Sequence, residues 1–310
     1  MDSQKLLSGW NDFWFAPVSA ISIAVYRIFF GVLATASGVS IGKDLLVWCG
    51  ENGVLSLKTA ESVAPHPHIN LFLFLPQGDC WVIAFFVLFM TAAIMLTVGL
   101  FTRWSAIAVW LGILSFCNRN PAFTNGGDNI MEICAFFLIF SQAGEALSVD
   151  RFLEGRKHNQ SLGVRRGAPW AQRLIQIQLV VIYFTAFCLK ISGRTWVSGE
   201  AVYYSSRMDL FWRFHIPYVF EHLWTIRLLT WGTLAFEGLF PVLIWIKEFR
   251  YPFLFIGLLF HAGLEAAMDI PFFQWATVAM YVTFIDPEDL NLVIAWIRGR
   301  VIRYFGKATT

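Results

Sequence analysis

Charged residues are scarce in this sequence, and their scarcity excludes an ordinary soluble domain. Asp, Glu, Lys and Arg make up 14% of the 310 residues, and 57% of the residues are hydrophobic. Soluble domains carry roughly a quarter charged residues, so this composition indicates a chain that lies in a lipid bilayer. The formal net charge is only +2, and no basic cluster is interleaved with aromatic residues. We therefore expect no nucleic-acid partner.

Cysteines are also few, and none of them lies in a metal or redox motif. The five cysteines are scattered without a CxxC pair, at Cys49, Cys80, Cys117, Cys134 and Cys188. This spacing argues against a disulfide framework, a zinc site or a dithiol motif, and we expect no metal. Two of them, Cys49 and Cys80, could share the outer side of the membrane, so a disulfide between these two is not excluded, although nothing in the sequence supports it.

Long apolar segments dominate what the sequence does contain. Eight of them are apolar enough to span a bilayer or nearly so, at about 17–40, 80–100, 104–120, 128–147, 174–193, 226–247, 251–269 and 272–286. A straight span needs about 20 residues, so the third and eighth segments are expected to be tilted, lengthened or partly re-entrant. The sequence predicts an all-α polytopic membrane protein with about eight transmembrane helices. Residues 1–310 are expected to form one transmembrane domain without a separate soluble domain.

Amphipathic stretches flank the apolar segments at both ends. In residues 1–16 the apolar face consists of Leu6, Leu7, Trp10, Phe13 and Trp14. In residues 288–306 it consists of Leu290, Val293, Ile294, Ile297 and Val301, beside Arg298, Arg300 and Arg303. Such helices lie in the interface of a bilayer rather than crossing it. Residues 1–16 also lack the short apolar core of a cleavable signal peptide.

The distribution of Lys and Arg predicts the orientation in the membrane. With eight spans, one side holds Lys5, Arg103, Arg151, Arg156, Lys157, Arg165, Arg166, Lys247, Arg250, Arg298, Arg300, Arg303 and Lys307. The other side holds Lys43, Lys58, Arg119, Arg194, Arg207 and Arg213. Cytoplasmic loops carry the excess of Lys and Arg, so both termini are expected to be cytoplasmic. Lys190 is then expected at the outer side.

Lys190 is the most informative single residue, because it ends a run from Leu179 to Leu189 that carries no charge. A lysine at membrane depth costs at least a few kcal/mol on insertion scales, so a chain that keeps one there usually needs it. Burial favours the neutral amine, which is a base. The alternative is a lysine whose flexible stem reaches the interface. If the helix continued, Trp196 would lie about 9 Å above Lys190, at 1.5 Å per residue.

Arg27, Glu237, Glu265 and His261 also fall inside predicted spans. The simplest interpretation of Arg27 and Glu237 is an ion pair in the bundle interior, with Glu265 as a further candidate, because unpaired charges are costly there. A pathway for protons or ions is the alternative. His261 would either bond to a neighbouring helix or titrate near neutral pH.

A polar loop over 118–128 separates two of the short spans. Asn and Gly are turn-forming residues, and Asn129 with Glu132 resembles the capping-box start of the following helix. Arg119 and Asp128 would both lie near the outer interface. Their sequence context leaves a structural pairing and a functional site equally open.

Several short motifs, in this order and spacing, resemble landmarks of the HTTM (horizontally transferred transmembrane) domain family. They are Tyr26–Gly31, Val98–Ser105, Asn125–Asp128, Leu147–Asp150, Lys190–Gly199, Phe236-Glu237 and Phe260-His261. The resemblance covers roughly residues 10–290. It is a resemblance to the membrane domain of vitamin K-dependent gamma-carboxylase.

The resemblance implies a multi-helix membrane domain whose reactive centre opens to the lumenal or periplasmic side. We expect the protein in a bacterial inner membrane, with its active face periplasmic. It implies Lys190 as the base acting on a reduced quinone, vitamin K or menaquinone-like, with O2 and CO2 as co-substrates. His261 matches the histidine of the family's Phe-His pair. Arg119, Asn125, Asp128, Trp196 and Glu237 are then expected to bind substrate. A secreted peptide is the expected partner for carboxylation or another modification.

The sequence departs from the carboxylase at three points. Gly127 stands where the carboxylase has a histidine, Lys190 stands where it has two adjacent lysines, and no counterpart of its large lumenal domain is expected in these residues. Carboxylation of a tagged glutamate therefore does not follow directly. The rival hypothesis is a non-catalytic membrane scaffold for maturation or export of a secreted peptide or toxin. A transporter built on Arg27, Glu237 and Glu265 ranks below both, because no internal repeat is visible.

Overall fold

The computed structural model describes residues 3–63, 68–121, 124–159, 163–209, 213–214 and 217–306, and the side chains of residues 4–300 among them. Within the expected C-terminal amphipathic stretch, the side chains of Val301 and Arg303 are therefore not described, and Lys307 lies outside the described residues. The first half of the chain contains α1 Ser3–Phe15, β1 Val18–Ser19, α2 Ile21–Lys43, α3 Leu45–Cys49, α4 Leu57–Val63, η1 Leu71–Phe74, α5 Asp79–Val98, α6 Thr102–Arg119, α7 Gly126–Ile139 and α8 Val149–Lys157. The second half contains β2 Arg166–Gly167, α9 Trp170–Ile191, α10 Arg194–Val197, α11 Ala201–Ser205, α12 Pro217–Glu221, α13 Leu223–Leu243, α14 Lys247–Ala267, α15 Phe273–Tyr281, η4 Val282–Phe284 and α16 Pro287–Gly306.

Four helices in the described part of the chain are long and apolar enough to cross a membrane, namely α2, α5, α9 and α13. The other predicted segments also form helices, but α7 has 14 residues and α15 has 9. The segment predicted to run from 128 to 147 ends its helix at Ile139. The all-helical class is confirmed for the described residues, apart from one antiparallel pair of two-residue strands, β1 and β2. The count of eight spans stays a prediction.

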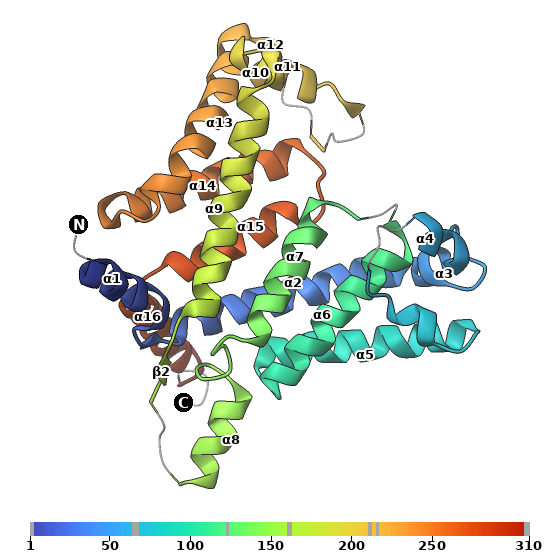
Figure 1. Cartoon of the computed structure of the whole chain (residues 1–310), viewed down its shortest axis with the longest axis vertical. Coiled ribbons are helices and arrows are strands. Elements are labelled where there is room, and N and C mark those ends of the chain that lie inside the picture. The colour runs from blue at the N-terminus through green and yellow to red at the C-terminus, as the bar shows by residue number, and fades with distance from the viewer. Residues whose placement is uncertain are drawn as a thin grey trace.

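The helices form two groups that diverge from a common base (Figure 1). Helices α9 and α13 pack together and run up to α10, α11 and α12. Helices α2, α5 and α6 run toward α3 and α4, and α15 packs against α7, α14 and α9 between the two groups. At the other end lie α1, α8, β2 and α16. The turn between α9 and α10 therefore stands at the far end of the bundle from α8 and α16.

Close packing between α2 and α5 depends on a glycine. A Cβ atom added to Gly31 would lie 2.4 Å from Thr97 Oγ1 and 2.8 Å from the Thr97 Cα atom. No side chain fits in that space without moving the neighbouring helix. Small residues at such contacts let two helix backbones approach closely, which is the common way that helices associate in membranes.

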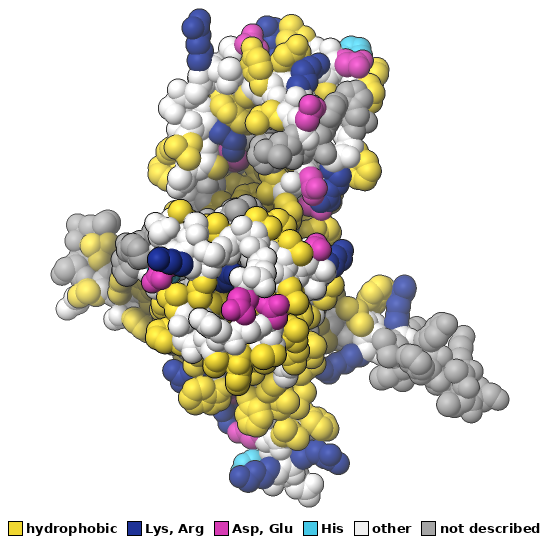
Figure 2. Space-filling view, turned by 90° about the vertical axis from the view of Figure 1, so that its right-hand side faces the viewer, with side chains coloured by type: hydrophobic (Ala, Val, Ile, Leu, Met, Phe, Trp, Pro, Cys, Tyr) yellow, Lys and Arg dark blue, Asp and Glu magenta, His cyan; other side chains and the backbone are white. Residues whose placement is uncertain are grey.

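Large apolar side chains cover much of the face of the bundle that Figure 2 shows. On α5, for example, Val87 and Leu88 are more than half exposed, and on α9 Phe184 and Leu189 are as well. Exposed apolar area of this extent fits contact with lipid rather than with water. Together with the four apolar helices, it indicates an integral membrane protein in a lipid bilayer.

Contacts among distant loops hold the base of the bundle together. Strand β1 pairs with β2, so that Val18 lies opposite Gly167. Asp150 at the start of α8 accepts hydrogen bonds of 2.8 Å from the backbone N–H groups of Phe101 and Thr102. The Arg250 guanidinium pairs with Asp286 at 2.8 Å. Segments with a predicted cytoplasmic location thus meet at one end of the molecule.

Candidate functional site

Lys190 lies in the last turn of α9 and forms an ion pair with Glu237 of α13. Its Nζ atom donates to both carboxylate oxygens, at 2.6 and 2.8 Å. The Lys190 side chain is 26% exposed, whereas that of Glu237 is 5% exposed. The carboxylate is therefore in the protein interior, and the ammonium group connects it to the surface.

The chain reverses directly after Lys190, and the reversal brings Trp196 over the ion pair. The backbone N–H of Gly193 donates to the Lys190 carbonyl at 2.9 Å, which ends α9. The short helix α10 follows, and the Trp231 indole of α13 donates to the Val197 carbonyl at 3.2 Å. The Lys190 Nζ atom then lies 5.2 Å from the centroid of the Trp196 ring, within the range of a cation–π interaction.

A second polar cluster lies deeper between α9, α14 and α15. The Nδ1 atom of His261 lies 2.5 Å from the Gln274 amide oxygen, and its Nε2 atom lies 2.6 Å from the Tyr183 hydroxyl. The Tyr183 hydroxyl also bonds to the Tyr281 hydroxyl. Because an amide oxygen only accepts, the Nδ1–H group donates to Gln274. With a neutral imidazole, Nε2 accepts from Tyr183, and the Tyr281 hydroxyl then donates to Tyr183.

The ion pair and the inner cluster are connected through α9 and α13. Tyr183 precedes Lys190 by seven residues and therefore lies on the same helix face, about 10 Å further in along the axis. Its ring packs against Phe236 and Phe240 of α13, with centroid distances of 5.4 and 4.2 Å. These two phenylalanines flank Glu237 along the α13 sequence. A line of polar groups thus runs from the end of α9 into the apolar core.

One donor in the inner cluster has no partner. The amide nitrogen of Gln274 is buried and makes no hydrogen bond among the described residues. A buried polar group without a partner costs about 1–3 kcal/mol, so such a group is a candidate contact for a bound molecule.

Arg119, predicted as a substrate-binding residue, anchors the loop between α3 and α4. Its guanidinium donates to the carbonyl oxygens of Cys49, Gly50 and Leu55 at distances of 3.1, 2.8 and 2.8 Å. No structural pairing with Asp128 is found between these described side chains. Arg119 therefore bonds to backbone carbonyls of the α3–α4 loop rather than forming an ion pair with Asp128.

Residues 15–288 of the chain match the HTTM domain family. The chain belongs to the HTTM domain family. It is a membrane protein related to the gamma-carboxylase family, and the match covers most of its length. No solved structure matches this chain.

The capping box of α7 in this HTTM protein is formed by Asn125 and Asp128, not by the predicted pair Asn129 and Glu132. The Asp128 carboxylate accepts from the Asn125 backbone N–H at 2.9 Å, and the Asn125 side chain accepts from the Gly127 backbone N–H at 2.7 Å. Both side chains are thus used to start a helix. Their role in binding substrate stays a prediction.

Gly127 of this HTTM protein has no room for a side chain. A Cβ atom at Gly127 would lie 2.7 Å from the backbone nitrogen of Phe273 and 3.0 Å from its Cα atom. The start of α15 therefore packs directly on the start of α7. The position where the carboxylase resemblance expects a histidine is closed by backbone contact.

The predicted ion pair between Arg27 and Glu237 is wrong. Arg27 is fully buried, and its guanidinium donates to the Ala143 and Leu147 carbonyls at 2.7 and 2.6 Å. These carbonyls follow the end of α7, where helical hydrogen bonding stops and acceptors are free. Glu265 pairs with Arg213 instead, and Asp269 also accepts from Arg213 at 2.7 Å.

Three members of the inner cluster in this HTTM protein were not anticipated from the sequence, namely Tyr183, Gln274 and Tyr281. They carry no charge, so they do not interrupt the apolar pattern as Lys190 does. The spacing of seven residues between Tyr183 and Lys190 is the signal that could have identified one of them. No group of three or more His, Cys, Asp and Glu residues is arranged to hold a metal in the described ranges.

Proposed function

We propose that this HTTM protein is a membrane enzyme in which Lys190 acts as a general base on the hydroxyl of a lipophilic, reduced-quinone-type substrate. The observation that carries the proposal is the bonding of Lys190 to both oxygens of the buried Glu237 carboxylate. A lysine held only for anchoring needs no such partner. A lysine that exchanges protons gains from one, because the carboxylate can receive a proton.

The proton balance of the pair explains how a charged lysine becomes a base. Transfer of one proton from the Lys190 ammonium to Glu237 leaves an amine beside a carboxylic acid. The amine then takes the proton of a substrate hydroxyl, which converts the bound substrate to its oxyanion. The regenerated ammonium stabilises that developing negative charge at short range.

The aromatic and polar groups nearby fit a hydroxylated ring. Trp196 covers the ammonium, Phe236 and Phe240 flank the line between the two clusters, and Gln274 offers an unpartnered buried donor. When bound, a reduced vitamin K or menaquinone-like molecule supplies the chemistry of oxidation by O2, which can drive removal of a peptide C–H proton and capture of CO2. In this proposal His261 and Tyr183 orient the substrate oxygen within the site.

The proposed topology has eight crossings in a bacterial inner membrane, with both termini cytoplasmic and Lys190 periplasmic. Two features support it: the excess of Lys and Arg in the loops of one end, and the contacts that gather those loops at the base of the bundle. Thiol labelling from outside tests this orientation. The native cysteines are first replaced by serine, because Cys80 and Cys188 are exposed. Single cysteines introduced at exposed Lys58 and Lys157 should then react with an impermeant reagent only at position 58.

Activity of Lys190 variants tests the catalytic role. Quinol epoxidation is measured on purified wild-type protein and on Lys190→Ala and Lys190→Arg. Arginine keeps a positive charge for Glu237 but does not release its proton, so this variant should fold normally and lose at least about a hundredfold in rate. Unchanged turnover in Lys190→Arg would reject the role of Lys190 as base.

A non-catalytic scaffold for a secreted peptide or toxin is the second candidate. It is favoured by Gly127, where backbone contact excludes the side chain that the carboxylase resemblance expects. A scaffold should bind a peptide with the same affinity in wild type and in Lys190→Arg, and should show no quinol turnover. An enzyme should show turnover that is sensitive to Lys190, so one pair of measurements separates the two.

A further inference from the structure

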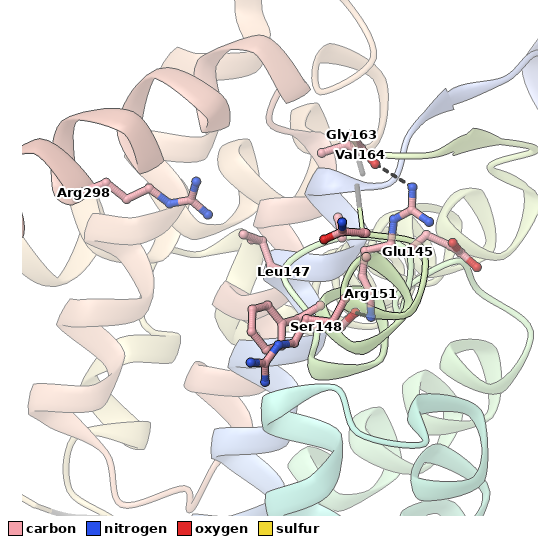
Figure 3. A pocket seen from close by; sticks show the side chains of 12 residues that line it. Glu145, Leu147, Ser148, Arg151, Gly163, Val164 and Arg298 are labelled. Carbon is pink, nitrogen blue, oxygen red and sulfur yellow. Dashed lines mark hydrogen bonds between the residues drawn. The ribbon is translucent and has the colours of Figure 1, made fainter. Parts of the chain in front are cut away.

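We infer that a pocket between α8 and α16 binds the head group of an anionic phospholipid. The pocket has a volume of about 740 Å³ and opens at the base of the bundle, far from Lys190. The residues of its wall that matter here are Leu147, Arg151, Phe152, Arg156, Val164 and Arg298. Figure 3 shows Arg298 extending from α16 toward the space beside Leu147.

The charge around this pocket is positive after its internal ion pairs are counted. Arg151 pairs with Glu154 at 2.6 Å, and Arg165 pairs with Glu145 and Glu154 at 3.1 and 2.5 Å. These contacts occupy both carboxylates. Arg156 and Arg298, in contrast, lie within 4 Å of no carboxylate in the described part of the chain.

Two arginines without carboxylate partners suit a phosphodiester. A guanidinium presents several N–H donors in a plane and binds phosphate oxygens in a bidentate manner. Arg156 is additionally placed by the Phe152 ring, whose centroid lies 5.7 Å from its guanidinium carbon. The two charges come from different helices, so a phosphate between them would connect α8 to α16.

Hydrogen bonds hold the backbone around the pocket in place. Arg27 fixes the Leu147 carbonyl at 2.6 Å, and Leu147 itself adopts a left-handed backbone with a φ of 47°. The Ser148 hydroxyl accepts from the Arg151 backbone N–H at 3.0 Å and starts α8. Arg151 also donates to the Gly163 carbonyl at 2.8 Å, as Figure 3 shows. The site is therefore formed before a ligand arrives.

Exposed apolar side chains in and next to the pocket wall favour a lipid over a soluble phosphate. Phe152 of the wall is 62% exposed, and near wall residues in sequence lie Leu153 on α8 and Trp296 and Ile297 on α16, which are 50%, 56% and 47% exposed. Apolar side chains next to a basic pocket can contact acyl chains while the arginines hold the head group. A soluble anion would make no use of these exposed side chains.

Lipid retention measured by native mass spectrometry tests this inference on the full chain. The purified protein is incubated with equimolar phosphatidylglycerol and phosphatidylcholine, and in a separate arm with inorganic phosphate. The test variant is the double substitution Arg156→Gln and Arg298→Gln. The matched control is Lys157→Gln with Arg300→Gln, which removes the same charge from the same two helices outside the pocket wall.

Wild type and control should each retain one phosphatidylglycerol in preference to phosphatidylcholine, and the test variant should retain it at least about tenfold less. Equal loss in both double variants would show a diffuse charge effect and overturn the site. Equal retention of the two lipids, or binding of inorganic phosphate without lipid preference, would overturn it as well. The measurement does not depend on Lys190 or on turnover, so the proposed function can fail while this site stands.

Discussion

Lys190 of α9 and Glu237 of α13 hold each other in a two-contact ion pair, 47 residues apart in sequence. The pair is asymmetric, because the carboxylate is buried and the ammonium is about one-quarter exposed. Loss of the lysine therefore strands a charge in the interior, whereas loss of the glutamate leaves a charge that can reach the surface. The two single substitutions should not be equivalent.

Lys190→Leu should destabilise the fold by about 3 kcal/mol, and Glu237→Leu should cost less. The double substitution should cost less than the sum of the two, because it leaves no unpaired charge. Thermal and denaturant unfolding in detergent measures all three. Lys43→Leu, at the exposed end of α2, is the control and should change stability by less than about 0.5 kcal/mol. A Lys190→Leu variant as stable as this control would contradict the structural role of the pair.

Gly127→Ala should destabilise the protein by about 1–3 kcal/mol, because its Cβ atom would meet the backbone of Phe273. Gly232→Ala on α13 is the matched control, since a Cβ atom there meets nothing within 4 Å. A glycine within a helix costs about 0.5–1 kcal/mol relative to alanine, so the control should gain stability. The two changes in unfolding midpoint should have opposite signs, and a stabilising effect at Gly127 would count against direct contact of α7 with α15.

The helices were predictable from the sequence, because apolar runs reveal where a bilayer-embedded helix lies without knowledge of its neighbours. The position of Lys190 at a helix end followed from the same pattern. Its partner did not, since Arg27 and Glu237 both lie mid-helix and the sequence does not say which way each one faces. The carbonyls that accept hydrogen bonds from Arg27 belong to a turn after α7. Because this turn is apolar, its hydropathy predicted that the helix continues through it.

The inner cluster could not be predicted from the sequence, for a different physical reason. Tyr183, Gln274 and Tyr281 come from two helices and meet His261 on a third only after the bundle packs. Hydroxyl and amide groups are compatible with an apolar segment, so none of these three residues stands out from the hydropathy pattern. Only His261 was identifiable, because an imidazole is unusual in a span.

Acid should remove a stabilising interaction at Glu154, which lies at the base of the bundle outside the four apolar helices. A hydrogen bond from Arg151, with the charge of Arg165 beside it, holds the pKa of Glu154 below its usual value of 4.5. A depressed pKa means that the folded state binds this proton less readily than the unfolded state. The contribution is thus present above pH 4.5 and is lost as the pH falls through the lower, folded-state pKa.

The difference in stability between wild type and Glu154→Gln should therefore shrink as the pH is lowered from about 6 to about 3. Unfolding midpoints across that range measure it. Glu61→Gln on α4 removes an exposed carboxylate that has no ion pair among the described residues, and it is the control for the loss of one surface charge. A Glu154→Gln difference that is constant down to the lowest pH would show that the arginines do not act on this carboxyl.

The inner cluster should respond in a graded way to removal of single hydroxyls. Tyr183→Phe leaves the His261 Nε2 atom and the Tyr281 hydroxyl without their partner, and should cost about 2 kcal/mol. Tyr281→Phe breaks only one of these bonds and should cost about half as much, while Tyr218→Phe at an exposed position should be neutral. Denaturant unfolding ranks the three variants. Equal effects of Tyr183→Phe and Tyr281→Phe would mean that the bond from Tyr183 to His261 contributes nothing, and the line of polar groups from Lys190 into the core would then end at Tyr183.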